Sequence, residues 1–179
     1  MHDIVYESES MLRQLQPPRR IVPFSIRKHG MPGMGGDLTD RPESALDIII
    51  AQLRKDARWY DEDVPVGQWV RFEARLGLVT TPAKQSRVLL FAEPPGHAST
   101  RRLVLRCAPE YLLDHSTEPR PIHWDGDDLV ALTRILDSAL DERTAALMGG
   151  YARVTVDTGN LPLVVASPLF VEYVSPPDQ

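Results

Sequence analysis

Residues 57–78, ARWYDEDVPVGQWVRFEARLGL, decide the fold class because they join the end of a helix to a long strand. An acidic turn bounded by Pro65 and Gly67 separates the two elements. Beyond the turn, successive side chains point to opposite faces, as a strand requires. One face carries Val70, Phe72, Ala74 and Leu76, and the other carries Trp69, Arg71, Glu73 and Arg75. This alternation predicts a strand with one face in the core and a polar face that is either solvated or lines a site.

Two amphipathic helices are predicted from apolar stripes with helical spacing. The first begins near Asp40, which can cap the helix with Glu43 in a capping box, and its stripe is Leu46, Ile49, Ile50, Leu53 and Ala57. The second begins at Asp127 or Asp128, and its stripe is Leu129, Leu132, Ile135, Leu136 and Leu140. Shorter helices are predicted from Ser8 to about Gln16, as a turn from Pro109 to His115, and from Asp141 to a stop at Gly149-Gly150.

Strands are predicted at 3–7, 19–28, 68–79, 87–93, 102–107, 151–158 and 163–174. The three central strands follow one another with short turns, one of them at 81–86, which is typical of an antiparallel meander. Pro168 indicates a bulge or an edge in the last strand. We therefore expect one α+β domain over residues 1–179, with a largely antiparallel sheet of about six to seven strands and the two main helices packed on one face. Residues 30–36 are expected to form a mobile glycine-rich loop, and residues 175–179 a loose tail.

Composition narrows the classes of function. The chain has 179 residues, a net charge of -5 and one cysteine. An acidic protein is poorly suited to neutralising phosphates, so no nucleic-acid partner is expected. No apolar run is long enough to span a membrane, and no disulfide can form within the chain. We expect no secretory signal, because residues 1–3 are not followed by a basic and then an apolar segment. We expect a cytoplasmic protein with no membrane partner, and its oligomeric state stays open.

The polar strand face is the best candidate for a site. Arg153, Thr155 and Asp157 share a predicted strand face with Tyr151, so a second strand also presents polar groups. Either this surface is solvated and holds cross-strand ion pairs, or it binds a ligand. Two arginines flanking a glutamate suit a carboxylate-bearing ligand, because guanidinium binds carboxylate in a bidentate fork. The candidate binding residues are Trp59, Trp69, Arg71, Glu73, Arg75 and Tyr151.

Catalytic and metal motifs are absent from the sequence. Cys107 shares a strand face with Leu103 and Leu105, which indicates a core position rather than a nucleophile. The run Asp61-Glu62-Asp63 lacks the alternate oxygen ligands of a calcium loop. The glycine-rich loop lacks the ending of a phosphate-binding P-loop. No metal and no cofactor are expected.

Several segments together resemble an uncharacterised family of small cytoplasmic proteins from streptomycetes and other actinobacteria. They are Val5-Tyr6-Glu7-Ser8 with Met11-Leu12, residues 57–60, residues 67–76, residues 107–113, residues 150–154 and residues 164–171. The resemblance implies a single domain, an actinobacterial source and a cytoplasmic location. It implies no activity and no catalytic residues.

Three hypotheses about function remain open. The first is a non-catalytic module that binds a small molecule or a protein partner through the polar strand face. The alternative is a cofactor-free tailoring enzyme of bacterial specialised metabolism, such as a cyclase, isomerase or hydrolase, because such an enzyme needs only a shaped pocket and one or two acid–base groups. Its candidate catalytic residues are Glu73, His123 and Tyr151, with Arg71 and Arg75 beside them. The third is an oligomer-forming subunit, which requires an exposed apolar patch at Leu163, Val165 and Phe170.

Overall fold

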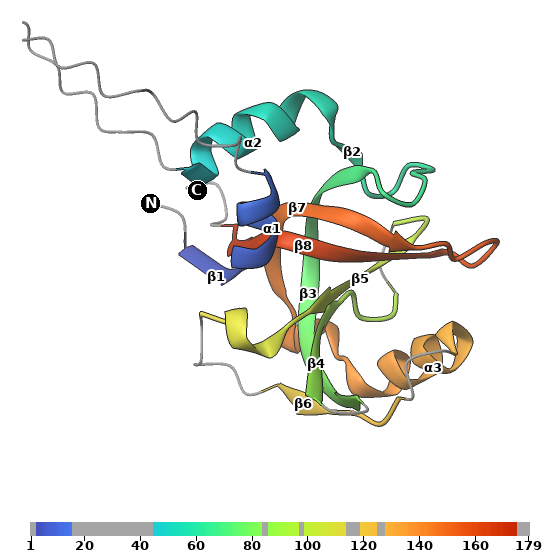
Figure 1. Ribbon diagram of the computed structural model, residues 1–179. Helices are drawn as coiled ribbons and strands as arrows, with labels where there is room; N and C mark the ends of the chain where they lie inside the picture. The colour runs from blue at the N-terminus through green and yellow to red at the C-terminus, as the bar shows by residue number, and fades with distance from the viewer. Residues whose placement is uncertain are drawn as a thin grey trace, which may run out of the picture.

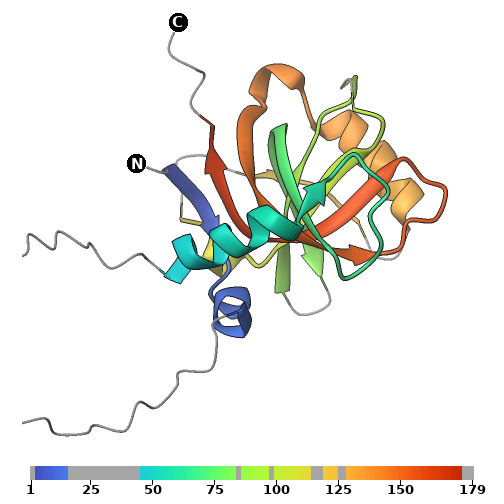
Figure 2. The same ribbon diagram turned by 90° about the horizontal axis from the view of Figure 1, so that it is seen from above.

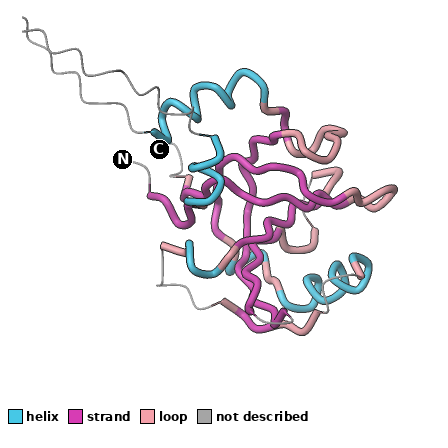
Figure 3. Tube along the Cα trace, in the orientation of Figure 1, coloured by secondary structure: helices cyan, strands magenta, loops and turns pink. Residues whose placement is uncertain are grey.

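The structure is a computed structural model that describes residues 3–15, 45–83, 86–96, 99–113, 119–124 and 128–174. It is an α+β fold with a mostly antiparallel sheet, as the sequence predicts, and strands at the centre with helices at the periphery (Figure 3). The strands are β1 (Asp3–Glu7), β2 (Arg58–Trp59), β3 (Trp69–Ala83), β4 (Ser86–Ala92), β5 (Arg102–Cys107), β6 (Arg120–Pro121), β7 (Ala146–Val156) and β8 (Leu163–Tyr173). The helices are α1 (Glu9–Leu15), α2 (Ala45–Asp56) and α3 (Leu129–Ala139), with single 3-10 turns η1 (Pro109–Tyr111) and η2 (Glu142–Thr144).

Five strands close into a barrel in the order β3, β4, β5, β8, β7 and back to β3 (Figure 1). All neighbours are antiparallel except β5 and β8, which are parallel. This order, with α3 between the third and fourth barrel strands, is the connectivity of the OB-fold, a five-stranded Greek-key barrel. A shared fold carries no function by itself.

The long strand β3 belongs to both halves of the barrel. Residues 69–76 pair with β7, and residues 77–83 pair with β4. The partner changes at Gly77, where an added Cβ would lie 2.6 Å from Leu140 Cδ2. Glycine therefore allows β3 to bend against the segment that follows α3, as barrel closure requires.

The apolar residues form three clusters. The first fills the barrel and includes the predicted inward face of β3, namely Val70, Phe72, Ala74 and Leu76. The second lies between α3 and the outer face of β4, β5 and β8. The third joins α1 and α2 to Leu169 and Phe170 of β8. Apolar residues on β8 thus serve all three clusters, which leaves Leu163, Val165 and Phe170 buried within the chain.

The predicted packing of both main helices on one face is wrong. Helix α2 lies beside β7 and β8, whereas α3 covers a different part of the barrel (Figure 1 and Figure 2). The cause is closure: a closed sheet has an outer surface that runs round the molecule, so its two apolar patches lie apart. The strand number also exceeds the prediction, because β2 and β6 are only two residues long and leave no sequence pattern.

Other boundaries differ in detail. The turn predicted at 81–86 is shorter, because β3 runs to Ala83 and β4 begins at Ser86. The helix predicted after Asp141 is a single 3-10 turn that ends at Thr144, and Gly149 and Gly150 lie inside β7. The bulge predicted at Pro168 is present, because the β7–β8 register shifts between Tyr151 and Ala152. The predicted strand at 19–28, the loop at 30–36, the helix start at Asp40 and the tail lie outside the described residues.

Candidate functional site

The predicted polar face of β3 lies on the outside of the barrel. Arg71, Glu73 and Arg75 are exposed there, while Trp69 is half-buried. Strand β7 runs alongside, with Tyr151 directly opposite Arg71 and Gly149 directly opposite Glu73. The two polar faces inferred from the sequence therefore form one surface.

A cavity of about 490 Å³ opens on this surface between the barrel and α2. Four of the six predicted binding residues line it, and the described chain adds residues from α2 and β8 that complete the walls. Its lining includes Arg54, Trp59, Arg71, Glu73, Tyr151 and Phe170. The volume falls within the range of ligand pockets, about 300–1,000 Å³.

Aromatic side chains hold the polar groups in place. The guanidinium carbon of Arg71 lies 5.7 Å from the centre of the Trp59 ring, a cation–π distance. The ring centres of Tyr151 and Phe170 are 5.9 Å apart. Because β2 pairs in parallel with β3, Trp59 is also the backbone neighbour of Arg71. The cavity therefore has an aromatic wall on each side of Arg71.

Two glycines of β7 line the cavity. An added Cβ on Gly150 would collide with the carbonyl oxygen of Phe170 and would lie 2.9 Å from Phe72 Cζ. A Cβ on Gly149 would lie 3.0 Å from Val174 Cγ2. The two glycines therefore allow β7 to pass close to its neighbours.

The charges in the cavity are partly unpaired. Among the described residues, the ion pairs are Arg13–Glu9, Arg101–Asp63, Arg102–Asp137 and Arg143–Asp141. The side chains of Arg54, Arg71 and Glu73 take part in none of them and form no hydrogen bond within that part of the chain. Asp47 and Glu172 also line the cavity, and each is already engaged in an interaction of its own. The free groups are thus two guanidinium groups and one carboxylate.

The turn that carries Trp59 is fixed by a buried carboxylate. Glu93 is fully buried, and its Oε1 accepts a hydrogen bond of 2.9 Å from the Tyr60 hydroxyl, while its Oε2 accepts one of 2.6 Å from Leu103 N. Burial raises the pKa of Tyr60, so this hydroxyl stays a donor. Ser99 Oγ also donates to the carboxylate, at 3.4 Å. The sequence analysis missed Glu93. Its position at the end of a predicted strand was the feature that could have indicated a structural role.

The acidic run in the same turn is tied to the start of β5. Asp61 Oδ1 accepts hydrogen bonds from Thr100 Oγ1 and from Arg101 N at 2.9 Å. Arg101 also donates to Glu62 O at 3.1 Å and pairs with Asp63 at 3.3 Å. These contacts account for the side chains of Asp61 and Asp63. Within the described residues, no group of three or more His, Cys, Asp or Glu side chains is placed to hold a metal ion.

The remaining predicted residues lie outside the cavity. Trp69 packs with the cluster of α1 and α2, and Arg75 donates to Ala145 O at 3.3 Å. His123 is exposed on the segment after β6, which pairs with the far end of β3. Its neighbour Trp124 anchors that segment, because Trp124 N donates to Thr81 Oγ1 at 3.2 Å. Glu73 and Tyr151 are therefore brought together without His123.

Sequence reasoning also missed Arg54. It belongs to α2 and lines the cavity together with Arg71, a role that the sequence suggested for Arg75. Its position just after Leu53 of the apolar stripe was the available signal, since a residue there flanks the side of the helix that meets the barrel.

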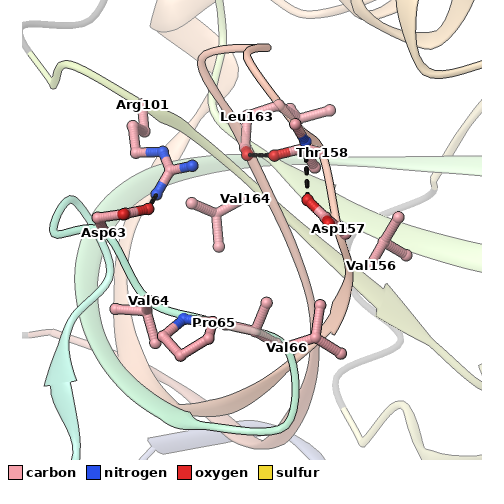
Figure 4. Close-up of a pocket in the computed structure, with 12 residues that line it drawn as sticks. Asp63, Val64, Pro65, Val66, Arg101, Val156, Asp157, Thr158, Leu163 and Val164 are labelled. Atoms are coloured by element: carbon pink, nitrogen blue, oxygen red, sulfur yellow. Dashed lines mark hydrogen bonds and ion pairs between the residues drawn. The ribbon is translucent and has the colours of Figure 1, made fainter.

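A larger cavity, of about 570 Å³, lies at the β7–β8 turn (Figure 4). Valines such as Val64, Val156 and Val164 line it, with Arg101 and Asp63 on one wall. Its polar groups are already paired: Arg101 binds Asp63, Thr158 Oγ1 donates to Leu163 O at 2.7 Å, and Gly159 N donates to Asp157 Oδ1 at 2.9 Å. It offers a ligand fewer free polar partners than the cavity beside α2.

The fold and the cavity together define a small α+β barrel protein with one polar, aromatic-walled pocket. No protein-family model, no curated protein and no solved structure matches the chain. The resemblance to an actinobacterial family therefore stays a prediction. None of the described helices has the length and apolar character needed to cross a bilayer.

Proposed function

We propose that this protein is a non-catalytic module that binds a small molecule carrying a carboxylate in the cavity between α2 and the β3–β7 surface. The observation that carries the proposal is the meeting of Arg54 and Arg71, two guanidinium groups without an ion pair among the described residues, in one cavity. Guanidinium forks bind carboxylates bidentately, which supplies both affinity and orientation.

The other groups of the cavity narrow the ligand further. Glu73 accepts hydrogen bonds and suits a ligand hydroxyl or amine near the carboxylate. Trp59 and Tyr151 offer flat apolar surfaces for the body of the ligand. The ligand class is thus a small polar acid with an unsaturated or cyclic body.

The enzyme alternative has weaker support. A cofactor-free cyclase, isomerase or hydrolase would need its acid–base groups around one reacting atom. Glu73 and Tyr151 line the cavity, but His123 does not. A protein partner remains the other form of the binding proposal, and the experiment below separates the two.

The test is native mass spectrometry of the protein purified from its own host. We expect a small-molecule mass on the wild type that disappears in Arg71→Ala and in Arg54→Ala. Arg75→Ala is the matched control, because Arg75 lies on the same strand and face but outside the cavity. Circular dichroism checks that every variant is folded.

Three results would count against the proposal. A wild-type chain without a small molecule, after incubation with a metabolite extract of the host, rejects a small-molecule site. A co-purifying protein that is lost in Arg71→Ala would show that this surface binds a protein partner instead of a small molecule. A ligand that leaves the Arg54→Ala and Arg71→Ala variants unaffected would place binding elsewhere.

A further inference from the structure

A separate cavity lies between α3 and the outer face of the barrel. Its volume is about 330 Å³. The sheet contributes Leu90, Val104 and Val165, the helix contributes Leu129 and Leu132, and Trp124 closes a side. It shares no residue with the cavity beside α2, so nothing in the proposed function accounts for it.

The walls of this cavity are mostly apolar. Leu90, Val104, Leu132 and Val165 are buried there. An apolar lining favours apolar molecules, because water beside it finds few hydrogen-bond partners. The body of a ligand here must therefore be hydrocarbon.

Hydrogen bonds hold Trp124, the aromatic wall of this cavity, in place before any ligand binds. The indole Nε1 of Trp124 donates to Asp128 O at 2.9 Å, and the backbone of Trp124 is bonded to Thr81 Oγ1 through both its amide and its carbonyl group. The indole has no polar group left to direct into the cavity, so it presents its ring. A pre-formed wall reduces the entropy lost when a ligand binds.

Arg106 places a positive charge at the rim of the cavity. Arg106 lies on β5 directly opposite Leu90 and is exposed. Its side chain forms no hydrogen bond or ion pair within the described ranges of the chain, although Asp157 lines the same cavity. Asp157 follows β7, and β8 lies between β7 and β5, so these strands are about 10 Å apart. The two charges therefore mark opposite ends of the cavity.

We infer that this cavity binds a small apolar carboxylic acid, with its hydrocarbon body between Trp124 and the β4–β5–β8 surface and its carboxylate on Arg106. The acidic end at Asp157 sets the direction, because a carboxylate there would meet a like charge. A ligand bound in the reverse direction is disfavoured for the same reason.

The test uses two probes with one carbon skeleton, 3-phenylpropionate and the neutral alcohol 3-phenylpropanol. Methyl NMR spectra of the full chain follow the signals of Val104, Leu132 and Val165 during titration. We expect both probes to shift these signals, and the acid to bind about 10-fold more tightly, as a charge-assisted hydrogen bond allows.

Variants make the assignment specific. Arg106→Gln should remove the preference for the acid while leaving the alcohol unchanged. Leu129→Trp should weaken both probes by filling the cavity, and its thermal unfolding confirms that it is folded. Arg71→Gln, in the other cavity, should change neither affinity. Equal binding of acid and alcohol by the wild type, an unchanged preference in Arg106→Gln, or no shift at the three methyl-bearing residues would each overturn the inference.

Discussion

The guanidinium carbon of Arg71 lies 5.7 Å from the centre of the Trp59 ring, on the edge of the cavity beside α2. Trp59 is the last residue of the two-residue strand β2, so its ring is positioned by the turn that follows. The contact limits the motion of a long, flexible side chain. It therefore prepares Arg71 for a ligand before the ligand arrives.

A double-mutant cycle should detect this contact. We expect Trp59→Leu and Arg71→Met to show a coupling of about 0.5–1 kcal/mol in urea unfolding, the size of an exposed cation–π interaction. Arg75→Met combined with Trp59→Leu is the matched control, and its coupling should be close to zero. Similar couplings in the two cycles would show that the ring does not hold Arg71.

The buried carboxylate of Glu93 should be costly to disturb. Tyr60→Phe removes one of its donors, and we expect a loss of about 1.5–3 kcal/mol of unfolding free energy, as for hydrogen bonds to charged groups. Glu93→Ala leaves Leu103 N and the Tyr60 hydroxyl without their acceptor, so its loss should be larger.

Urea unfolding monitored by tryptophan fluorescence measures both variants. Glu110→Gln, at an exposed position, is the control and should stay within about 0.5 kcal/mol of the wild type. A Tyr60→Phe variant as stable as the wild type would mean that the hydrogen bond contributes nothing.

The thiol of Cys107 should be inert in the folded protein. Burial raises the pKa of this thiol, and only the thiolate is nucleophilic. We expect alkylation by iodoacetamide at pH 8 to be slower than in urea by a factor on the order of 100 or more. A second thiol placed on the outer face of β7 by Thr155→Cys should react at an ordinary rate, and mass spectrometry should find a single rapid adduct.

The carboxyl group of Asp141 should titrate at low pH. Hydrogen bonds from the side chain and backbone of Arg143 lower its pKa from 3.8 to about 2. Because the folded pKa is below the unfolded one, the stabilisation is present above about pH 4 and is lost as the pH falls toward 2.

NMR titration of the Asp141 carboxyl carbon checks this value. In Arg143→Ala the side-chain donor is gone while the backbone donor remains, so the pKa should rise part of the way toward 3.8. An unchanged midpoint in this variant would assign the shift to the backbone alone.

The sequence predicts the faces of β3 and β7 correctly, because a strand has only two faces and the apolar residues choose between them. It also predicts that α3 begins at Asp127 or Asp128. The cap is Asp128, whose carboxylate accepts hydrogen bonds of 2.9 Å from Val130 N and Ala131 N. Both features depend on residues close together in the chain. They need no knowledge of the rest of the fold.

Barrel closure, by contrast, could not be predicted from local sequence. The parallel pairing of β5 with β8 joins strands that are distant in the sequence, and the sequence of neither strand indicates which strand it pairs with. Arg54 was missed for the same reason, because the direction in which α2 meets the barrel is a property of the folded chain. The polar residues that β3 and β7 contribute to the site were predictable from the alternation of strand faces, and the residue contributed by a docked helix was not.

The change of partner within β3 also bears on how the chain folds. Residues 69–76 of β3 pair with β7, and β7 begins only at Ala146, near the end of the chain. A nascent chain can form the β3–β4–β5 meander early, but the first half of β3 then has only the two-residue strand β2 as a neighbour. Such distant pairings slow folding, because the entropy of closing a long loop is lost before the contacts are gained. The site on β3 and β7 therefore comes into being only with the last hairpin, so a truncated chain should lack it altogether.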